Sequence, residues 1–257
     1  MPQNTLHISS LRRERDNGTW RVSARIGAQR LWFECADAEL IACPEAFLTA
    51  FFIPALQANA QLTIDADVDS RWVDQTHRLL PVYHRWWGYP TTHPVNHAGH
   101  AGPAPDRPAP GSCSGSPPSS TAQCFTGGID SFYSLLRGSH DAGRLLYVHG
   151  FDIPIDDRQR VHAFQDALRA VARDTGTAPI RVRTNLRQHP IFNRVSWERT
   201  HGAALATVGM LLSKRIDALV IPSSYAYDDH TPWGSHWDTD PLWAAPDRLR
   251  VIHDDAT

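Results

Sequence analysis

Short apolar runs alternate with longer amphipathic runs through the second half of this 257-residue chain. Runs of the length and composition of buried strands lie at residues 121–125, 145–148, 180–182, 218–221 and 251–252. The segments between them carry apolar residues at helical spacing. This alternation predicts an α/β fold, a doubly wound parallel sheet over residues 121–257 with helices on both faces. Ligands of such sheets bind at the carboxyl ends of the strands, near a topological switch point.

Two helices of this segment have clear sequence signals. Asp156 and Asp157 precede an amphipathic run that Gly176 closes, as a capped helix requires. Residues 203–212 are apolar almost all round and predict a helix buried on several sides. We expect this helix to begin at Gly202, with its first N–H groups free to bind an anion.

The chain before this segment divides into two parts. Residues 1–96 predict a small α+β domain, with a hairpin over residues 20–33, a helix from Pro44 that ends or kinks near Pro54, and a further strand over residues 62–64. Residues 97–120 are dense in Gly, Pro and Ser and predict a flexible linker. We expect the histidines near and within this linker, His93, His97 and His100, to be solvated rather than metal ligands.

The segment Phe125-Thr126-Gly127-Gly128-Ile129-Asp130-Ser131 reads as a strand end, a tight turn and a helix start. Glycines at such a turn let backbone N–H groups point into one small concavity. The N-terminus of the helix adds about half a positive charge. The segment therefore predicts an anion cradle suited to phosphate, with a structural turn as the alternative.

These residues resemble the PP-loop of the ATP pyrophosphatase family in the HUP superfamily, usually written Ser-Gly-Gly-x-Asp-Ser. Thr126 replaces the first Ser and keeps a hydroxyl, while Gly127, Gly128, Asp130 and Ser131 match. The stretches around His149, His201 and His236 look like those of an uncharacterised bacterial branch of this family. A Walker-type site is excluded, because that loop needs a lysine directly after its last glycine and the only lysine is Lys214.

The resemblance implies ATP and Mg²⁺ as cofactors and cleavage between the α- and β-phosphates. It implies that Thr126, Gly127, Gly128 and Ser131 hold phosphate and that Asp130, a catalytic residue together with Ser131, helps to hold Mg²⁺. It also implies that the backbone of Val148 and Gly150 borders the adenine, and that Ser223 and Ser224 lie near the phosphates or the acyl acceptor. Ordinary turn chemistry is the alternative for the serine pair.

Two further stretches contribute candidate residues. His201 precedes the predicted buried helix and is a candidate catalytic residue. Residues 225–243 form a long polar and aromatic stretch without helical or strand period, which is typical of a binding loop or lid. It supplies candidate substrate-binding residues: Tyr225, Trp233, Ser235 and His236. His236, Asp238 and Asp240 are an alternative set of divalent-ion ligands.

Composition limits the class of protein. No apolar run approaches the about 20 residues of a membrane span, and no signal-peptide pattern is present, so we expect a cytoplasmic protein. The formal charge of −2 argues against nucleic acid as a partner. The four cysteines form no CxxC pair or zinc spacing. A small-molecule substrate is the expected partner, and the oligomeric state stays open, a homodimer included.

The expected reaction is ATP-dependent adenylation of a small carboxylate- or amide-type substrate with release of pyrophosphate, followed by attack of a nitrogen or sulfur nucleophile. The alternative is a non-catalytic adenine-nucleotide-binding module. A tRNA-thiolating enzyme is disfavoured, because neither a positioned cysteine pair nor a basic appendage is evident. The sequence stops just after the last predicted strand, which favours a domain that is truncated at its C-terminus or incomplete as an enzyme.

Overall fold

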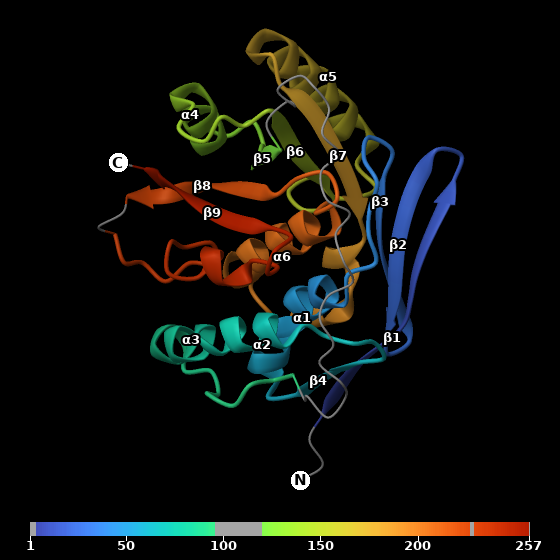
Figure 1. Ribbon diagram of the computed structural model, residues 1–257, viewed down its shortest axis with the longest axis vertical. Coiled ribbons are helices and arrows are strands. Elements are labelled where there is room, and N and C mark those ends of the chain that lie inside the picture. The colour runs from blue at the N-terminus through green and yellow to red at the C-terminus, as the bar shows by residue number, and fades with distance from the viewer. Residues whose placement is uncertain (1–3, 96–119, 227–228, 257) are drawn as a thin grey trace.

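The computed structural model describes residues 4–95, 120–226 and 229–256, and its strands form one nine-stranded mixed sheet (Figure 1). Along the sheet the order is β4-β1-β2-β3-β7-β6-β5-β8-β9. The strands are β1 (Thr5–Asp16), β2 (Thr19–Ile26), β3 (Gln29–Cys35), β4 (Gln61–Ile64), β5 (Thr121–Cys124), β6 (Arg144–His149), β7 (Ala178–Thr184), β8 (Ala218–Ala226) and β9 (Arg250–Ala256). The helices are α1 (Pro44–Ala58), α2 (Ser70–His77), α3 (Leu79–Trp87), α4 (Ile129–Arg137), α5 (Arg158–Thr175) and α6 (Trp197–Leu211), with short 3-10 turns η1 (Leu186–Gln188), η2 (Pro190–Asn193) and η3 (Asp240–Trp243).

The five strands after residue 120 are all parallel to one another. From β5 the chain adds β6 and β7 on one side and then returns to add β8 and β9 on the other. The switch point therefore lies between the carboxyl ends of β5 and β8, directly before the Gly-Gly turn. The prediction of an α/β fold with a largely parallel sheet is confirmed, with an antiparallel hairpin region at the N-terminal side.

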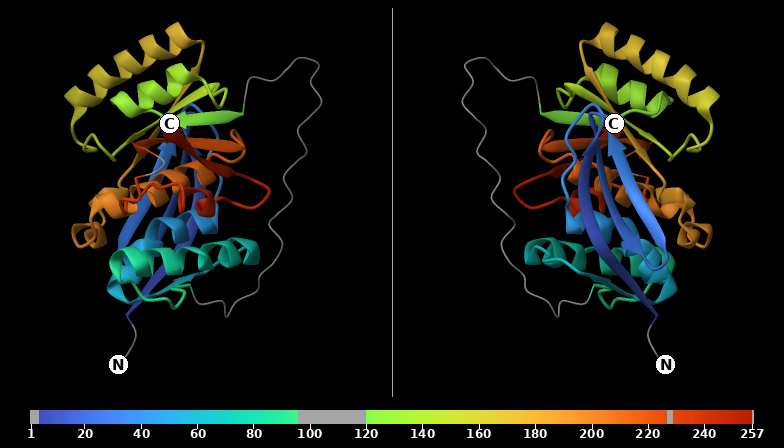
Figure 2. Two further views of the ribbon diagram at one scale, coloured as in Figure 1. Left: turned by 90° about the vertical axis from the view of Figure 1, so that its left-hand side faces the viewer. Right: turned by 90° about the vertical axis from the view of Figure 1, so that its right-hand side faces the viewer.

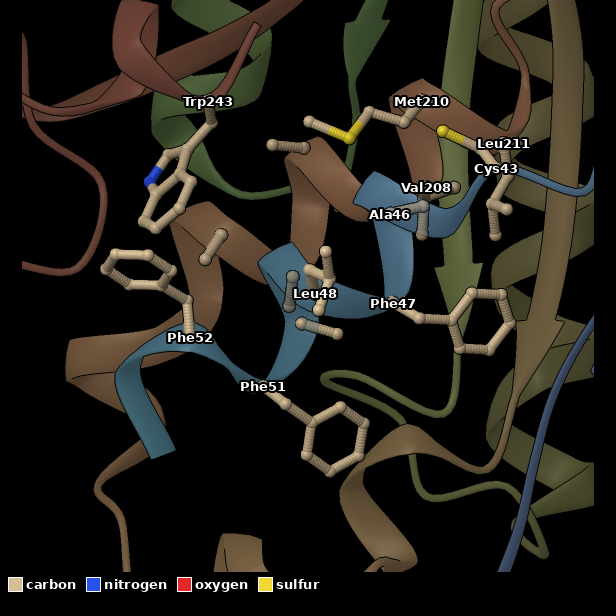
Figure 3. Close-up of a cluster of buried hydrophobic side chains, with 14 of the residues drawn as sticks. Cys43, Ala46, Phe47, Leu48, Phe51, Phe52, Val208, Met210, Leu211 and Trp243 are labelled. Carbon is tan, nitrogen blue, oxygen red and sulfur yellow. The ribbon is translucent and has the colours of Figure 1, made fainter. Parts of the chain in front are cut away.

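Helices cover both faces of the parallel strands (Figures 1 and 2). Residues of α4 and α5 pack on a small core that includes Phe125, Leu145 and Tyr147. The opposite face belongs to a much larger core that contains residues of α1 and α6. Figure 3 shows α1 crossing α6 there, with Phe47 and Leu48 on one helix and Met210 on the other. In β6, Leu145 and Tyr147 belong to the small core and Leu146 and Val148 to the larger one, as the pleat of a strand requires.

The N-terminal segment continues the same sheet instead of forming a separate one. Residues Phe33–Cys35 of β3 pair antiparallel with Val182–Thr184 of β7. The junction carries side-chain bonds as well: Asn185 accepts from the Trp32 N–H at 2.9 Å and donates to the Arg30 carbonyl at 2.9 Å. The two segments that the sequence suggested as separate domains thus share a sheet and the larger core. The predicted linker, residues 97–120, lies outside the described residues except for Ser120.

Several predicted elements differ in their limits. α6 begins at Trp197, where Ser196 caps it, so the expectation that Gly202 opens this helix is wrong. α1 continues through Pro54 to Ala58. The long strand β1 was not predicted at all, because many of its residues are exposed and its apolar alternation is weak. Among the described residues, no helix is long and apolar enough to cross a membrane.

Candidate functional site

A cavity of about 200 Å³ opens at the switch point between β5 and β8. It is lined by the end of β5 and the first turn of α4, by the end of β6 and the residues after it, by the first half of α6, and by β8 together with Ser235. The described lining residues are Cys124, Phe125, Thr126, Asp130, Ser131, Leu146, Tyr147, Val148, Phe151, Asp152, Trp197, His201, Leu205, Ile221, Pro222, Ser224 and Ser235. The candidate residues in this lining are Thr126, Asp130, Ser131, Val148, His201, Ser224 and Ser235. The candidates outside it are Gly127, Gly128, Gly150, Ser223, Tyr225, Trp233 and His236.

The Gly-Gly turn leads directly into α4. Gly127 has φ +77°, a conformation that side chains disfavour, and a Cβ there would lie 3.2 Å from the ring of Phe164 on α5. Gly128 is the N-cap of α4, without a side-chain bond to the helix. Thr126, Gly127 and Gly128 are all exposed. The turn therefore offers backbone N–H groups at a helix N-terminus to solvent, which is the arrangement that anions bind.

Asp130 and Ser131 follow this turn in the first turn of α4 and differ in their surroundings. Asp130 is exposed, and its Oδ2 accepts a hydrogen bond of 3.1 Å from the Ser224 hydroxyl at the end of β8. Ser131 is buried, and its hydroxyl donates to the Gly128 carbonyl at 2.8 Å. The Ser131 carbonyl accepts from the buried Gln123 amide at 2.8 Å. Asp130 faces the open site with Ser224, whereas Ser131 uses its hydroxyl to hold the turn.

The residues after β6 occupy the opposite wall. Val148 lines the cavity, as do Phe151 and Asp152, which follow directly after β6. Gly150 has φ +107°, and a Cβ there would lie 2.1 Å from the Thr184 carbonyl oxygen of β7. Its N–H donates to the Ile153 carbonyl at 3.1 Å. Gly150 therefore shapes the turn and has no free N–H for a base, while Val148 remains available to border one.

His201 lies in the second turn of α6 and lines the cavity. Its Nδ1 lies 3.3 Å from the Trp197 carbonyl, an acceptor only, so Nδ1 carries the proton and Nε2 is an acceptor. Burial lowers the pKa of His201 below its ordinary value, so the ring is neutral at pH 7. A neutral imidazole at this position can accept a proton or a hydrogen bond from a bound molecule.

The stretch after β8 reaches the site through Ser235, which lines the cavity, and through Trp233, which contacts the lining residue His201. The Trp233 ring lies 5.6 Å from His201 and 5.5 Å from Tyr225 between ring centroids. This stretch is fixed to α6 by a contact that only glycine permits: a Cβ on Gly202 would lie 2.2 Å from the Gly234 carbonyl oxygen. The Gly234 N–H donates to the Glu198 carbonyl at 2.7 Å. The close approach brings Trp233 and Ser235 to the site. Tyr227 and Asp228, in the same stretch, lie outside the described residues.

His236 does not line this cavity. It faces a second cavity of about 600 Å³ with Arg85 and Trp86 of α3. Its Nδ1 accepts from the Asp238 N–H at 3.0 Å. Asp240 lies elsewhere, bonded to Ser235 and to His253. The alternative metal set of His236, Asp238 and Asp240 is therefore not assembled, and the described residues contain no group of three or more His, Cys, Asp or Glu side chains that could hold a metal ion.

A polar array next to the cavity was only partly predicted from the sequence. Ser223 was a candidate and Asp240 only an alternative metal ligand, whereas His253 was not a candidate. The Ser223 Oγ lies 3.0 Å from His253 Nε2, and His253 Nδ1 lies 2.8 Å from Asp240 Oδ2. His253 belongs to β9 and Asp240 to η3. The pairing of β8 with β9 places His253 beside the end of β8, a contact that no local pattern encodes.

The charge of the site is set by acidic groups. Asp130 and Asp152 line the cavity, and the lining residues that the structure describes include no lysine or arginine. Phosphate bound here would therefore meet the turn N–H groups and the α4 N-terminus together with two carboxylates. A divalent cation between the carboxylates and phosphate oxygens would balance these charges, and carboxylate oxygen is the ligand type that Mg²⁺ takes. Comparison of the chain with protein-family models, curated proteins and solved structures finds no match.

Proposed function

We propose that this protein binds ATP at the switch point as PP-loop proteins do, within a HUP-like sheet, and adenylates a small carboxylate- or amide-type substrate. The observation that carries the proposal is the exposed Gly127-Gly128 turn at the N-terminus of α4, beside a cavity between β5 and β8. Strand order, turn and cavity coincide at the position where nucleotides bind in open α/β sheets.

Different residues would contact the two ends of the nucleotide, the phosphates and the base. The turn N–H groups receive the β- and γ-phosphates, which depart as pyrophosphate when a substrate oxygen attacks the α-phosphorus. Mg²⁺, when bound, would neutralise charge on the phosphate oxygens, and Asp130, with Asp152 across the cavity, would hold it. Ser224 orients the Asp130 carboxylate through its 3.1 Å hydrogen bond. Val148 borders the base.

The acceptor substrate would occupy the side of the cavity formed by α6 and the stretch after β8. The cavity of about 200 Å³ is smaller than the roughly 300–1,000 Å³ of ordinary small-molecule sites. The triphosphate would therefore extend over the exposed turn, leaving the cavity for the base and a small reacting group. His201, with Nε2 as acceptor, is placed to remove a proton from the attacking group of the second step.

The test is release of pyrophosphate from ATP and Mg²⁺ in the presence of mixtures of small carboxylates, amides and amines. We expect Asp130→Asn to reduce pyrophosphate release by at least about 100-fold, because it removes the metal-holding charge while keeping the shape. Asp141→Asn is the matched control, since Asp141 is an exposed aspartate outside the cavity lining. Equal rates in both variants would contradict the role of Asp130.

A second candidate is a nucleotide-binding module without catalysis. It is favoured by one observation: no cationic side chain is among the described lining residues, although many phosphoryl-transfer sites use one to stabilise the transition state. Calorimetry with ATP and Mg²⁺ separates the candidates. Tight binding with neither pyrophosphate nor AMP formed across all acceptor mixtures would support the module, and absence of binding would contradict both.

A further inference from the structure

Ser223, His253 and Asp240 have the arrangement of a nucleophile, a base and an orienting acid. The Ser223 Oγ lies 3.0 Å from His253 Nε2, within the range of about 2.6–3.2 Å for such pairs. On the far side of the ring, His253 Nδ1 lies 2.8 Å from Asp240 Oδ2. The Asp240 side chain is fully buried, and the His253 side chain is 6% exposed. The three residues come from β8, β9 and η3, so the array is entirely a product of the tertiary structure.

The hydrogen bonds determine which atoms of the array donate and which accept. Asp240 Oδ2 also accepts from the Ser235 hydroxyl at 2.6 Å, so it behaves as a carboxylate acceptor. His253 Nδ1 therefore carries a hydrogen and donates a hydrogen bond to Asp240. Nε2, on the other side of the ring, is then the atom that can accept from Ser223. The Ser223 hydroxyl has two acceptors within reach, this nitrogen and the Tyr225 carbonyl at 2.6 Å. A rotation of the hydroxyl is enough to place its proton on the base.

The environment favours reaction over a purely structural role. β8 is irregular between Pro222 and Ala226, in the segment that contains Ser223, and such irregularities often lie beside active sites. The Tyr225 N–H points at the Ser223 Oγ from 3.3 Å and would stabilise negative charge there. Asp240 Oδ1 is buried and has no hydrogen-bond partner, a cost that a simple structural network would not require.

Ser223 lies beside the cavity, although it is not itself among the lining residues. It is half-buried rather than sealed, and its chain neighbours Pro222 and Ser224 line the cavity. Ile221, two residues earlier in the same strand, lines it too, as does Ser235, which holds Asp240. A molecule bound in the cavity therefore lies close to the only serine that the structure places against a histidine among its described hydrogen bonds.

We propose that Ser223 is an acyl-accepting nucleophile, with His253 as its general base and Asp240 as the residue that orients His253. The Ser223 Oγ attacks the carbonyl carbon of an activated acyl group, and its proton moves to His253 Nε2. The carbon–oxygen bond to the leaving group breaks, the leaving group departs with the bonding electron pair, and His253 passes its proton to that group or to solvent. The product is a serine ester, which water or an amine then cleaves.

The proposal rests on the proposed function only for the source of the acyl group. An acyl adenylate formed at the neighbouring turn would be the donor and AMP the leaving group. The nucleophile itself does not require ATP, so it can be tested without nucleotide. A failure of the ATP site and a failure of Ser223 are therefore distinguishable.

The test is covalent labelling of the full chain by a fluorophosphonate ester, followed by mass spectrometry of the intact protein and of its peptides. We expect one label, on Ser223: its Oγ bonds to phosphorus, fluoride leaves and His253 takes the proton. Ser223→Ala should abolish the label, and His253→Gln should slow it by about 100-fold. Ser139→Ala, a change at an exposed serine outside the cavity lining, should leave labelling unchanged.

Asp240→Asn tests the positioning role, and circular dichroism must first show that the variant is folded. Asp240→Asn should slow labelling of the folded protein by at least about 10-fold, and Asp240→Glu, which keeps the carboxylate, should restore much of the rate. If Asp240→Asn does not fold, the labelling rate of Asp240→Glu decides the point, because it should lie between the rates of wild type and His253→Gln. No labelling of wild type, or labelling that persists in Ser223→Ala, would overturn the proposal whatever the protein does with ATP.

Discussion

At the scale of single residues, glycine positions do much to shape the site. Gly127 permits the turn before α4, Gly202 and Gly234 let the stretch after β8 touch α6, and Gly150 lets the chain pass against β7. At Gly202 and Gly150 an added Cβ would lie 2.2 Å or less from a carbonyl oxygen, a distance that no rotamer change relieves. The site therefore depends on where the backbone approaches itself as much as on which side chains it carries.

Gly150→Ala is expected to destabilise the fold by at least about 3 kcal/mol. The variant combines strain at φ +107° with overlap between its Cβ and the Thr184 carbonyl oxygen. Gly138→Ala is the matched control, because Gly138 has φ +68° but nothing within 4 Å, so only about 1 kcal/mol of backbone strain is expected. Urea unfolding of both variants measures the difference. A Gly150→Ala variant no less stable than Gly138→Ala would contradict this account of the turn.

At the scale of elements, the junction between β3 and β7 joins the hairpin region to the parallel strands. The ladder there has three residue pairs, and side chains reinforce it. Thr184 donates to the Trp32 carbonyl at 2.7 Å, and Arg181 forms an ion pair with Asp37. The Asn185 side chain bonds to two backbone groups of β3 beyond the ladder, the Trp32 N–H and the Arg30 carbonyl. The union of the two halves of the sheet thus relies on a few specific polar contacts.

Asn185→Ala is expected to lower the free energy of unfolding by about 1–3 kcal/mol, since the Trp32 N–H and the Arg30 carbonyl lose their partner. Hydrogen exchange at the Trp32 amide should accelerate more than exchange in β5. Asn193→Ala, at an exposed asparagine of η2, serves as the control. Equal exchange rates in the two variants would show that the ladder alone holds the junction.

At the scale of the whole molecule, burial keeps several histidines neutral. Desolvation lowers the pKa of each of four histidines spread over the fold: His149, His189, His201 and His236. The unfolded chain titrates near the ordinary histidine pKa of about 6.5, so it binds protons before the folded protein does. Stability is therefore complete above about pH 6.5 and falls as the pH drops below this value.

The free energy of unfolding is expected to fall between pH 7 and pH 5, by up to about 1.4 kcal/mol per pH unit for each proton by which the two states differ. Urea unfolding at the two pH values measures this change. His189→Gln should reduce the pH dependence, whereas His162→Gln should not, because His162 is exposed on α5. A stability independent of pH in this range would mean that the buried rings titrate normally.

Local sequence patterns predict the alternation of strands and helices after residue 120, the capping of α5 by Asp157 and Gly176, and the Gly-Gly turn before α4. These are local features, fixed by the spacing of apolar residues and by the conformations that glycine and aspartate favour. Three features appear only in the folded molecule: β3 pairs with β7, His236 lies outside the cavity, and Asp240 and His253 converge on Ser223. Those contacts join residues far apart in the chain, and burial of the shared core, which no short window of sequence contains, sets them in place.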